Sequence, residues 1–191
     1  MKSLADVTLI GIAGVPEHVA PCQRAMARSM RQVEFGEAFL LTEPMTYQEH
    51  NRFILHGLHR EFTTSHCLII HADSWVLNGD AWDDRWLEFD WVGAPWYDCA
   101  FRPDGTVGNG GFCLRSRRLL SRLSKMPLPD SFNEDTLASI TWRDWLEYEG
   151  FKWAGEESAA RFSFETRFRE STFGFHGNRL PESSSLISEN P

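Results

Sequence analysis

Strand-like and helix-like segments alternate over the first third of the chain, and this alternation constrains the fold more than any other feature of the sequence. Apolar runs at 7–14 (VTLIGIAG), 37–42 (EAFLLT) and 67–73 (CLIIHAD) predict three strands. The segments between them, 16–30 and 46–62, are typical of helices. Such alternation indicates right-handed crossovers between parallel strands. We therefore expect an α/β fold with a mainly parallel central sheet flanked by helices, and ligands beyond the carboxyl ends of its strands.

Local signals mark the limits of two helices. Thr46, followed three residues later by Glu49, forms a capping box, which predicts a helix start at this point. Another helix is expected from 134 to about 149, with Asn133 as its N-cap and Gly150 as its stop. We expect a single apolar stripe along this helix, formed by Leu137, Ile140, Trp145 and Tyr148.

A polar residue interrupts the buried stripe of the helix that begins near Thr46. Tyr47, Ile54 and Leu58 fall on one face of a helical wheel, and Asn51 lies within that face. A buried amide needs hydrogen-bond partners. Asn51 could tie the helix to a neighbouring loop, or it could hold a base or ribose beside Arg52.

Length and charge bound the class of protein. A chain of 191 residues suits one domain, which we expect over 1–180, followed by a flexible, serine-rich tail at 181–191. The net charge of −8 argues against nucleic acid and anionic membranes as partners, because both bind concentrated Lys and Arg. The N-terminal apolar run is too short for a signal peptide or a membrane span, so we expect a cytoplasmic protein.

The four cysteines are scattered without a CxxC pair, so neither a zinc site nor a thioredoxin-like motif is expected. Free cysteines are often buried, and we expect reduced thiols in the core. The residues concerned are Cys22, Cys67, Cys99 and Cys113.

His71 and Asp73 flank a small residue at the end of the third predicted strand. Alternation along a strand would point both side chains to the same side, where they could share one cation. An imidazole with a carboxylate suits manganese or another divalent transition ion, whereas magnesium prefers oxygen ligands. Alternatively, Asp73 caps the next turn and His71 is a hydrogen-bonded core histidine.

The motif VGNGGF at 107–112 contains three glycines around Asn109, which allow positive φ and a close approach of the backbone to a ligand. It lacks the GxGxxG and GxxxxGK[ST] patterns, so it predicts no Rossmann or P-loop phosphate site. The motif could be a plain tight turn, or its amides and Asn109 could hold substrate hydroxyls. The arginines that follow, Arg115, Arg117 and Arg118, favour a solvated helix face over a phosphate clamp.

Two further motifs carry candidate chemistry. NED places Glu134 and Asp135 in the first turn of a helix, where the helix dipole favours carboxylates and would keep Asp135 ionised, as a general base must be. Stabilisation of the helix start would also explain both acids. FGFHGN places His176 between aromatic residues and glycines, either as a packed imidazole or as a metal ligand.

The order of these motifs resembles a known family. NRFILHGL is followed by an apolar strand ending in HADSWVL, then by GNGGFCLRS, NEDTL and FGFHG. This order resembles GT-A glycosyltransferases, and most closely a domain-of-unknown-function family commonly grouped with that fold. The similarity covers roughly residues 46–120, including FDWVGAPW, and is looser elsewhere. The wider layout is similar to the β-1,4-galactosyltransferase group, and implies a GT-A-like, Rossmann-related sheet.

The resemblance implies a donor and metal site. Asp73 corresponds to the second acid of the DxD motif, which binds the divalent ion bridging the donor diphosphate. His71 replaces the first acid of that motif, which puts the metal dependence in question. His176 corresponds to the late histidine ligand, and Asn51 with Arg52 would lie near the nucleotide. The implied cofactor is Mn²⁺, with Mg²⁺ as the alternative, and the implied donor is a UDP-sugar.

The resemblance also implies an acceptor site. Asp135 corresponds to the catalytic base, Glu134 to an acceptor-binding carboxylate, and Gly110 with Gly111 to the acceptor turn, beside Asn109. Tryptophans could stack on sugar rings, although core packing also explains most of them; the candidates are Trp75, Trp91 and Trp96. The acceptor would be a glycan or another hydroxyl compound.

We therefore expect an inverting, metal-dependent nucleotide-sugar glycosyltransferase. Two other functions fit the same residues. One is a catalytically silent sugar- or nucleotide-binding module of the same fold. The other is a metal-dependent hydrolase that uses His71, Asp73 and His176.

Overall fold

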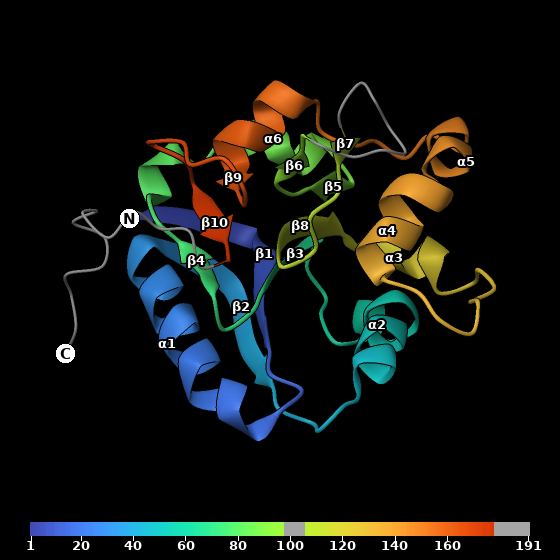
Figure 1. The fold of residues 1–191 in the computed structure, drawn as a ribbon. Coiled ribbons are helices and arrows are strands. Elements are labelled where there is room, and N and C mark those ends of the chain that lie inside the picture. Colours follow the sequence, from blue (N-terminus) through green and yellow to red (C-terminus); the bar gives the residue numbers. More distant parts are fainter. Residues whose placement is uncertain (98–105, 178–191) are drawn as a thin grey trace.

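The central sheet has five strands in the order β2-β1-β3-β8-β5 (Figure 1). A computed structural model describes residues 1–97 and 106–177. Strand β1 pairs in parallel with β2 and β3, whereas β8 is antiparallel to both β3 and β5. The strands are β1 (Lys2–Ile12), β2 (Val33–Leu41), β3 (His66–Ile70), β5 (Trp91–Val92) and β8 (Phe112–Ser116). The α/β prediction is confirmed, but the sheet is mixed and not mainly parallel, with two parallel and two antiparallel pairs of strands.

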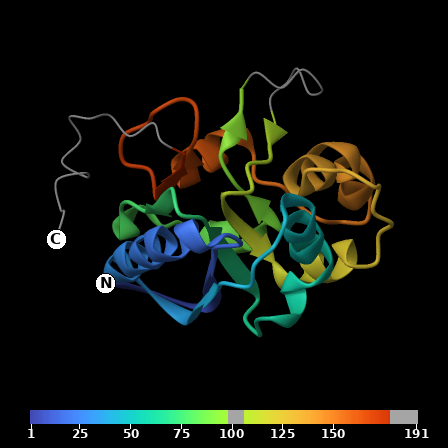
Figure 2. The same cartoon turned by 60° about the horizontal axis from the view of Figure 1, so that its bottom comes forward.

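The helices of the first half form where the sequence predicts them. Helix α1 (Pro16–Gln32) begins with a proline, whose fixed φ suits the first helical turn, and packs against β1, β2 and β4. Helix α2 (Tyr47–His56) has the predicted capping box between Thr46 and Glu49, and continues into the 3₁₀ turn η1 (Leu58–Arg60). Figures 1 and 2 show α1 and α2 on either side of the carboxyl end of β1.

Two small sheets complete the strands. The first has the order β4-β10-β9, so the strand that follows β3 pairs with a strand near the end of the described chain. The second pairs β6 with β7. Their strands are β4 (Ser74–Val76), β6 (Pro95–Trp96), β7 (Thr106–Val107), β9 (Ser163–Phe164) and β10 (Gly174–His176), and the 3₁₀ turns η2 (Gly79–Ala81) and η3 (Asp84–Glu88) lie between β4 and β5.

The helix expected over 134–149 is interrupted. Helix α4 (Glu134–Thr136) leads into the π-helical turn η4 (Leu137–Thr141), and α5 (Arg143–Tyr148) follows. A π-helical turn holds one more residue than an α-helical turn, so it rotates the residues after it away from the expected face. Leu137 is buried, but Trp145 and Tyr148 are 45% and 90% exposed. The predicted single stripe is therefore wrong beyond the π-helical turn, although Gly150, at φ +90°, does follow the helix end.

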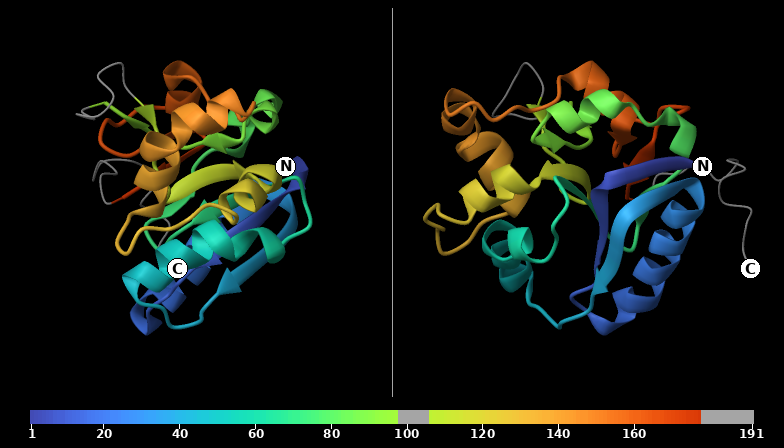
Figure 3. Two further views of the ribbon diagram at one scale, coloured as in Figure 1. Left: turned by 90° about the vertical axis from the view of Figure 1, so that its right-hand side faces the viewer. Right: turned by 180° about the vertical axis from the view of Figure 1, so that it is seen from behind.

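The remaining helices cover the later part of the chain. Helix α3 (Arg117–Leu123) packs against α2, while α5 and α6 (Glu156–Phe162) lie at the end of the molecule away from α1 and α2 (Figures 1 and 3). An aromatic cluster fills the core under α6, and consists of Trp82, Trp86, Phe112, Phe162 and Phe173.

Three of the four cysteines are free and buried, as predicted: Cys22, Cys67 and Cys113. Cys99 and the tail expected at 181–191 lie outside the described residues. Within the described ranges, no helix has the length and apolar character needed to cross a membrane.

Candidate functional site

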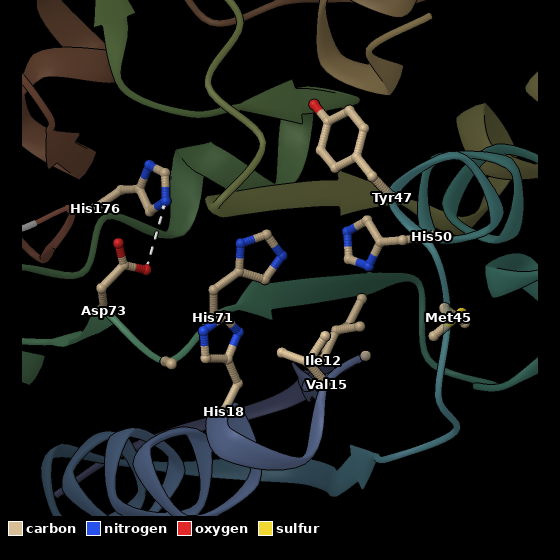
Figure 4. A pocket seen from close by; sticks show the side chains of 11 residues that line it. Ile12, Val15, His18, Met45, Tyr47, His50, His71, Asp73 and His176 are labelled. Atoms are coloured by element: carbon tan, nitrogen blue, oxygen red, sulfur yellow. Dashed lines mark ion pairs between the residues drawn. The ribbon is translucent and has the colours of Figure 1, made fainter. Parts of the chain in front are cut away.

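A cavity of about 580 Å³ opens at the carboxyl ends of β1 and β3 (Figure 4). Its walls come from the loop after β1, the first turns of α1 and α2, the loop after β3 and the end of β10. The side chains that Figure 4 labels in this wall are Ile12, Val15, His18, Met45, Tyr47, His50, His71, Asp73 and His176. The carboxyl edge of a parallel pair of strands is the expected place for a ligand in an α/β sheet.

The antiparallel pairing of β3 with β8 brings two predicted motifs together. Ile70, the last residue of β3, pairs with Phe112, the first residue of β8. The loop after β3 therefore meets the glycine turn before β8. Ser74 fixes this contact, because its Oγ donates to the carbonyl of Gly111 at 2.8 Å and accepts from the His71 backbone N–H at 2.8 Å.

Asp73 and His176 face each other across the cavity wall, with 3.6 Å between Oδ1 and Nε2 (Figure 4). Strand β3 ends at Ile70, so the expected alternation along a strand does not orient His71 and Asp73. The register of the small sheet does this instead: His176 pairs with Ser74, and the N–H of Gly177 donates to the Asp73 carbonyl at 3.0 Å.

His71 lies in the middle of the cavity wall, and its ring has edge contacts with His50 and His176 at centroid distances of 5.4 and 6.0 Å (Figure 4). Burial, together with the positive charges that His50 and His176 carry when protonated, lowers the pKa of His71 to about 3, so the ring is neutral. Its buried Nε2 has no hydrogen-bond partner within 1–97 and 106–177. An unpartnered buried nitrogen is costly and calls for a water, an ion or a ligand atom.

Two of the three expected metal ligands lie close together. Asp73 and His176 converge, and both line the cavity. Counting only the described residues, no three His, Cys, Asp or Glu side chains are grouped to hold one ion. A divalent ion bound by few side chains takes its other ligands from water and substrate phosphates. Asp73 and His176 therefore fit a cation that is completed by the substrate.

His176 also contacts Glu165, the residue that directly follows β9. Nδ1 of His176 lies 3.3 Å from Oε1 of Glu165. Burial opposes the charged form of His176, but the Glu165 hydrogen bond and the charges of Asp73, Glu165 and Asp135 raise its pKa. Sequence reasoning missed Glu165, together with His18 and His50 in the cavity wall, because none of them stands in a recognisable motif. Tyr47 was expected in the buried stripe of α2, which is wrong, because its side chain is 63% exposed at the cavity.

The glycine turn packs closely against the side chains of His176 and Glu134. A Cβ at Gly111 would overlap the His176 ring, and a Cβ at Gly110 would overlap the Glu134 carboxylate. Among the described glycines, only Gly150 and Gly177 have positive φ, so the turn does not use the positive φ that its glycines allow. The close approach is to side chains instead.

Asn109 stabilises the same turn. Its Oδ1 accepts hydrogen bonds from the backbone N–H groups of Gly111 (3.1 Å) and Phe112 (3.3 Å). The whole segment from Asn109 to Gly111 is buried. The turn therefore holds neighbouring side chains in place.

Arg115 and Glu134 form a buried ion pair beside the cavity. Both guanidinium Nη atoms donate to the two carboxylate oxygens, at 2.6 and 2.8 Å, and the side chains are 0% and 7% exposed. The guanidinium also stacks 3.8 Å over the Trp91 ring. The expectation of a solvated Arg115 is therefore wrong, because β8 is buried on both faces; Arg117 and Arg118 are exposed.

The pKa of Asp135 lies well above the ordinary value for an aspartate. Burial, and secondarily the negative charge of Glu134, raise the pKa of Asp135 to about 6. The pKa lies above its ordinary value, yet below neutral pH, so the expectation that Asp135 is ionised at neutral pH still holds. A base with a pKa near the working pH is well matched to proton transfer.

Asn51 is buried as predicted and ties α2 to the loop before α4. Its Nδ2 donates to the Phe132 carbonyl at 3.0 Å, and its Oδ1 accepts from the Glu134 N–H at 3.4 Å. Both ends of the amide are thus used within the protein, which supports the first of its two expected roles. Arg52 is exposed, and neither residue lines the cavity.

The three candidate tryptophans differ in setting. Trp91 is fully buried and stacks on Trp153, and Trp75 packs edge-on against Phe175. Trp96 is half-buried, and its ring lies directly over Gly108. Core packing thus accounts for Trp91, and Trp96 remains the candidate for contact with a sugar.

A family model described as "Protein of unknown function (DUF5672)" matches residues 31–181, which include every site residue predicted from the sequence but not Ile12, Val15 and His18 of the cavity wall. No curated protein matches the chain. Similar solved structures include the crystal structure of A197 from STIV, with a TM-score of 0.42 and 17% sequence identity; the match covers 71% of this chain and 75% of that chain. Neither finding specifies a reaction.

Proposed function

The chain belongs to the DUF5672 family, and from its site we propose that it is a GT-A-like glycosyltransferase that transfers a sugar from a nucleotide sugar to an acceptor hydroxyl with inversion. One observation carries the proposal. A cavity at the carboxyl edge of parallel strands presents Asp73 and His176 3.6 Å apart, and the charge of Asp135, whose pKa is about 6, acts on the same histidine. The resemblance to GT-A glycosyltransferases suggests the class of reaction, and the geometry of the site suggests the role of each residue.

The donor occupies the cavity in this proposal. Helix α1 begins at its wall, with Val15 as the N-cap, and the free N–H groups of a helix start favour an anionic group such as a diphosphate. Asp73 and His176 would hold a divalent cation, Mn²⁺ or Mg²⁺, with His71 as a neutral imidazole beside them. When bound, the cation neutralises the charge that develops on the leaving diphosphate.

Asp135 acts as the general base. Its ionised carboxylate takes the proton of the acceptor hydroxyl while the acceptor oxygen forms a bond to the anomeric carbon. The bond from that carbon to the diphosphate oxygen breaks, and the electron pair leaves with the nucleoside diphosphate. Arg115 binds both carboxylate oxygens of Glu134. Glu134 therefore acts on the base only through its negative charge, which helps to raise the pKa of Asp135.

The acceptor contacts Trp96 and not the glycine turn. Asn109, Gly110 and Gly111 are buried and engaged with neighbouring side chains, so they support the site from within. Trp96 is half-buried and is the surface on which an acceptor sugar stacks.

Titration of UDP and UDP-sugars in the presence and absence of Mn²⁺, combined with an assay for transfer to a panel of sugar acceptors, tests the function. We expect Mn²⁺-dependent binding and acceptor-dependent release of UDP, both lost in Asp73→Ala. Asp135→Asn should retain binding and lose transfer, with exposed Asp130→Asn as the matched control from the same segment. Binding without turnover in every variant would instead indicate the silent module. Free sugar as the sole product, even with acceptors present, would indicate the hydrolase.

A further inference from the structure

A second cavity, of about 540 Å³, lies at the opposite end of the strand pair that positions the first cavity. His66 and Ser116 form part of its wall, and they pair where β3 begins and β8 ends. Strand β3 is buried along its whole length, and its five residues span roughly 13 Å at about 3.3 Å for each residue step. The two cavities are therefore separate, and they have no lining residue in common.

Arg117, the first residue of α3, brings a positive charge to the wall of the second cavity. Its Nε donates a hydrogen bond to the carbonyl of His59 at 3.1 Å, which holds the guanidinium at the cavity. Over the ranges 1–97 and 106–177, the two terminal Nη groups of Arg117 have no hydrogen-bond partner and no acid within ion-pair distance. These groups are therefore available to a ligand.

The two acids in the wall do not neutralise Arg117. Asp90 is buried, and its carboxylate accepts hydrogen bonds from the Arg118 guanidinium, the Ser116 hydroxyl and a backbone N–H. The charge of Asp90 is thus matched by Arg118. Glu88 is exposed, so water weakens its attraction for any group in the cavity. The cavity keeps the charge of Arg117 for a ligand.

The surroundings of His59 are also positive. Its Nδ1 is buried and lacks a hydrogen-bond partner in the described part of the chain. Burial, and then the basic side chains of Arg60, Arg117, His56 and Lys125, lower the pKa of His59. The whole chain carries a net charge of −8, so these basic groups are a local concentration against the overall charge. An anion is the kind of ligand that relieves repulsion between such groups.

Hydroxyl groups line much of the remaining wall. They belong to Thr63, Thr64, Ser65, Ser116 and Ser121. Ser121 follows Arg117 by four residues on α3, so the two side chains lie on the same face of the helix. Its hydroxyl has no hydrogen-bond partner among the described residues. An arginine with free terminal nitrogens, next to a free hydroxyl, is a donor set that suits the oxygens of a phosphate group.

We propose that the second cavity binds a phosphate group, either free or carried by a small hydroxyl compound such as a sugar phosphate. The Nη groups of Arg117 bind the phosphate oxygens, and the hydroxyl of Ser121 donates a further hydrogen bond. The remaining hydroxyls of the wall contact the body of the ligand. The proposal goes beyond the transferase activity and does not depend on it, because the two cavities are separate.

Titration calorimetry with inorganic phosphate, glucose 6-phosphate and glucose tests the proposal. The titrations contain EDTA, so the cation-dependent binding proposed for the first cavity does not contribute. We expect wild type to bind glucose 6-phosphate and phosphate, and not glucose. Tighter binding of glucose 6-phosphate than of phosphate indicates a phosphate ester as the ligand, whereas equal affinities indicate that the phosphate group alone is recognised.

Two variants and one control locate the binding. Arg117→Ala should weaken the binding of glucose 6-phosphate about 10-fold or more, because it removes hydrogen bonds between two charged groups. Ser121→Asp should have a similar effect, because its carboxylate would pair with Arg117 four residues away and repel the phosphate. Arg24→Ala also removes one positive charge, from an exposed position on α1, and should leave the affinity unchanged.

The proposal is overturned if wild type binds neither phosphate nor glucose 6-phosphate. It is also overturned if a folded Arg117→Ala or Ser121→Asp binds like wild type, or if Arg24→Ala weakens binding as much as Arg117→Ala does. Circular dichroism identifies a variant that has lost its fold. Ser121→Asp leaves the hydrogen bond from Arg117 to the His59 carbonyl in place, so it decides the matter if Arg117→Ala does not fold.

Discussion

Breaking the buried ion pair between Arg115 and Glu134 should destabilise the protein far more than breaking an exposed one. In Glu134→Gln, one amide oxygen replaces two carboxylate oxygens that now accept at 2.6 and 2.8 Å. The guanidinium, fully buried, would keep its positive charge without a counterion. Removing one partner of such a pair typically costs about 3–5 kcal/mol. We expect this range for Glu134→Gln, slightly reduced by the contact of Arg115 with the Trp91 ring.

The chain contains a matched control. Arg122 and Glu149 form the same two-bond arrangement, at 2.8 and 3.0 Å, but their side chains are 25% and 29% exposed. Solvent reaches this pair, so Glu149→Gln should cost much less stability than Glu134→Gln. The two variants differ mainly in burial, which is the variable under test.

Urea unfolding followed by tryptophan fluorescence measures both losses. The reasoning also predicts that the double variant Arg115→Met, Glu134→Leu recovers most of the stability, because apolar replacement removes the desolvation cost together with the attraction. If Glu134→Gln is no more destabilising than Glu149→Gln, the charge of Arg115 is compensated in some other way and the argument fails.

Four further predictions concern Asp135, Asp73 and Asn51. Asp135→Asn should reduce transfer about 100-fold or more, and the wild-type rate should fall below about pH 6 as Asp135 is protonated; a flat profile there would remove it as the base. Because its pKa is higher in the folded state (about 6) than the ordinary value of 3.8, ionised Asp135 destabilises the fold, so Asp135→Asn should gain at most about 3 kcal/mol at neutral pH in urea unfolding, and the gain should vanish as pH falls from about 6 to 4. Asp73→Ala should abolish Mn²⁺-dependent binding of UDP in calorimetry with an unchanged melting temperature, and equal affinity would refute its role. Asn51→Leu should cost about 1–3 kcal/mol in unfolding, since it leaves the Phe132 carbonyl and the Glu134 N–H unpaired; no loss would show that these groups find water.

Local signals in the sequence predicted local structure well. The capping box of Thr46 and Glu49 needs only neighbouring residues, and it is present. Buried Asn51 followed from helical periodicity alone. The antiparallel direction of β8 was not predicted, because a short strand carries no signal for the direction of its partner. The sequence pattern likewise contains no sign of the extra residue in the π-helical turn η4.

The resemblance implied that Asp73 and His176 lie together, and the structure places them 3.6 Å apart. The register of β4 with β10 brings them there, and local spacing does not reveal that register. Glu165 is an isolated acid in the sequence, and only the fold places it behind His176. Arg115 looked solvated because two exposed arginines follow it closely.

The small sheet that carries His176 has a consequence for inactivation by heat. Its strands β4, β10 and β9 have three, three and two residues, and the central five-stranded sheet does not include them. Short strands of this kind open at lower free energy than a central sheet. Opening of β10 would carry His176 away from both Asp73 and Glu165 while the main core stays folded. The proposed transferase activity should therefore disappear on warming before the global unfolding transition, and return on cooling.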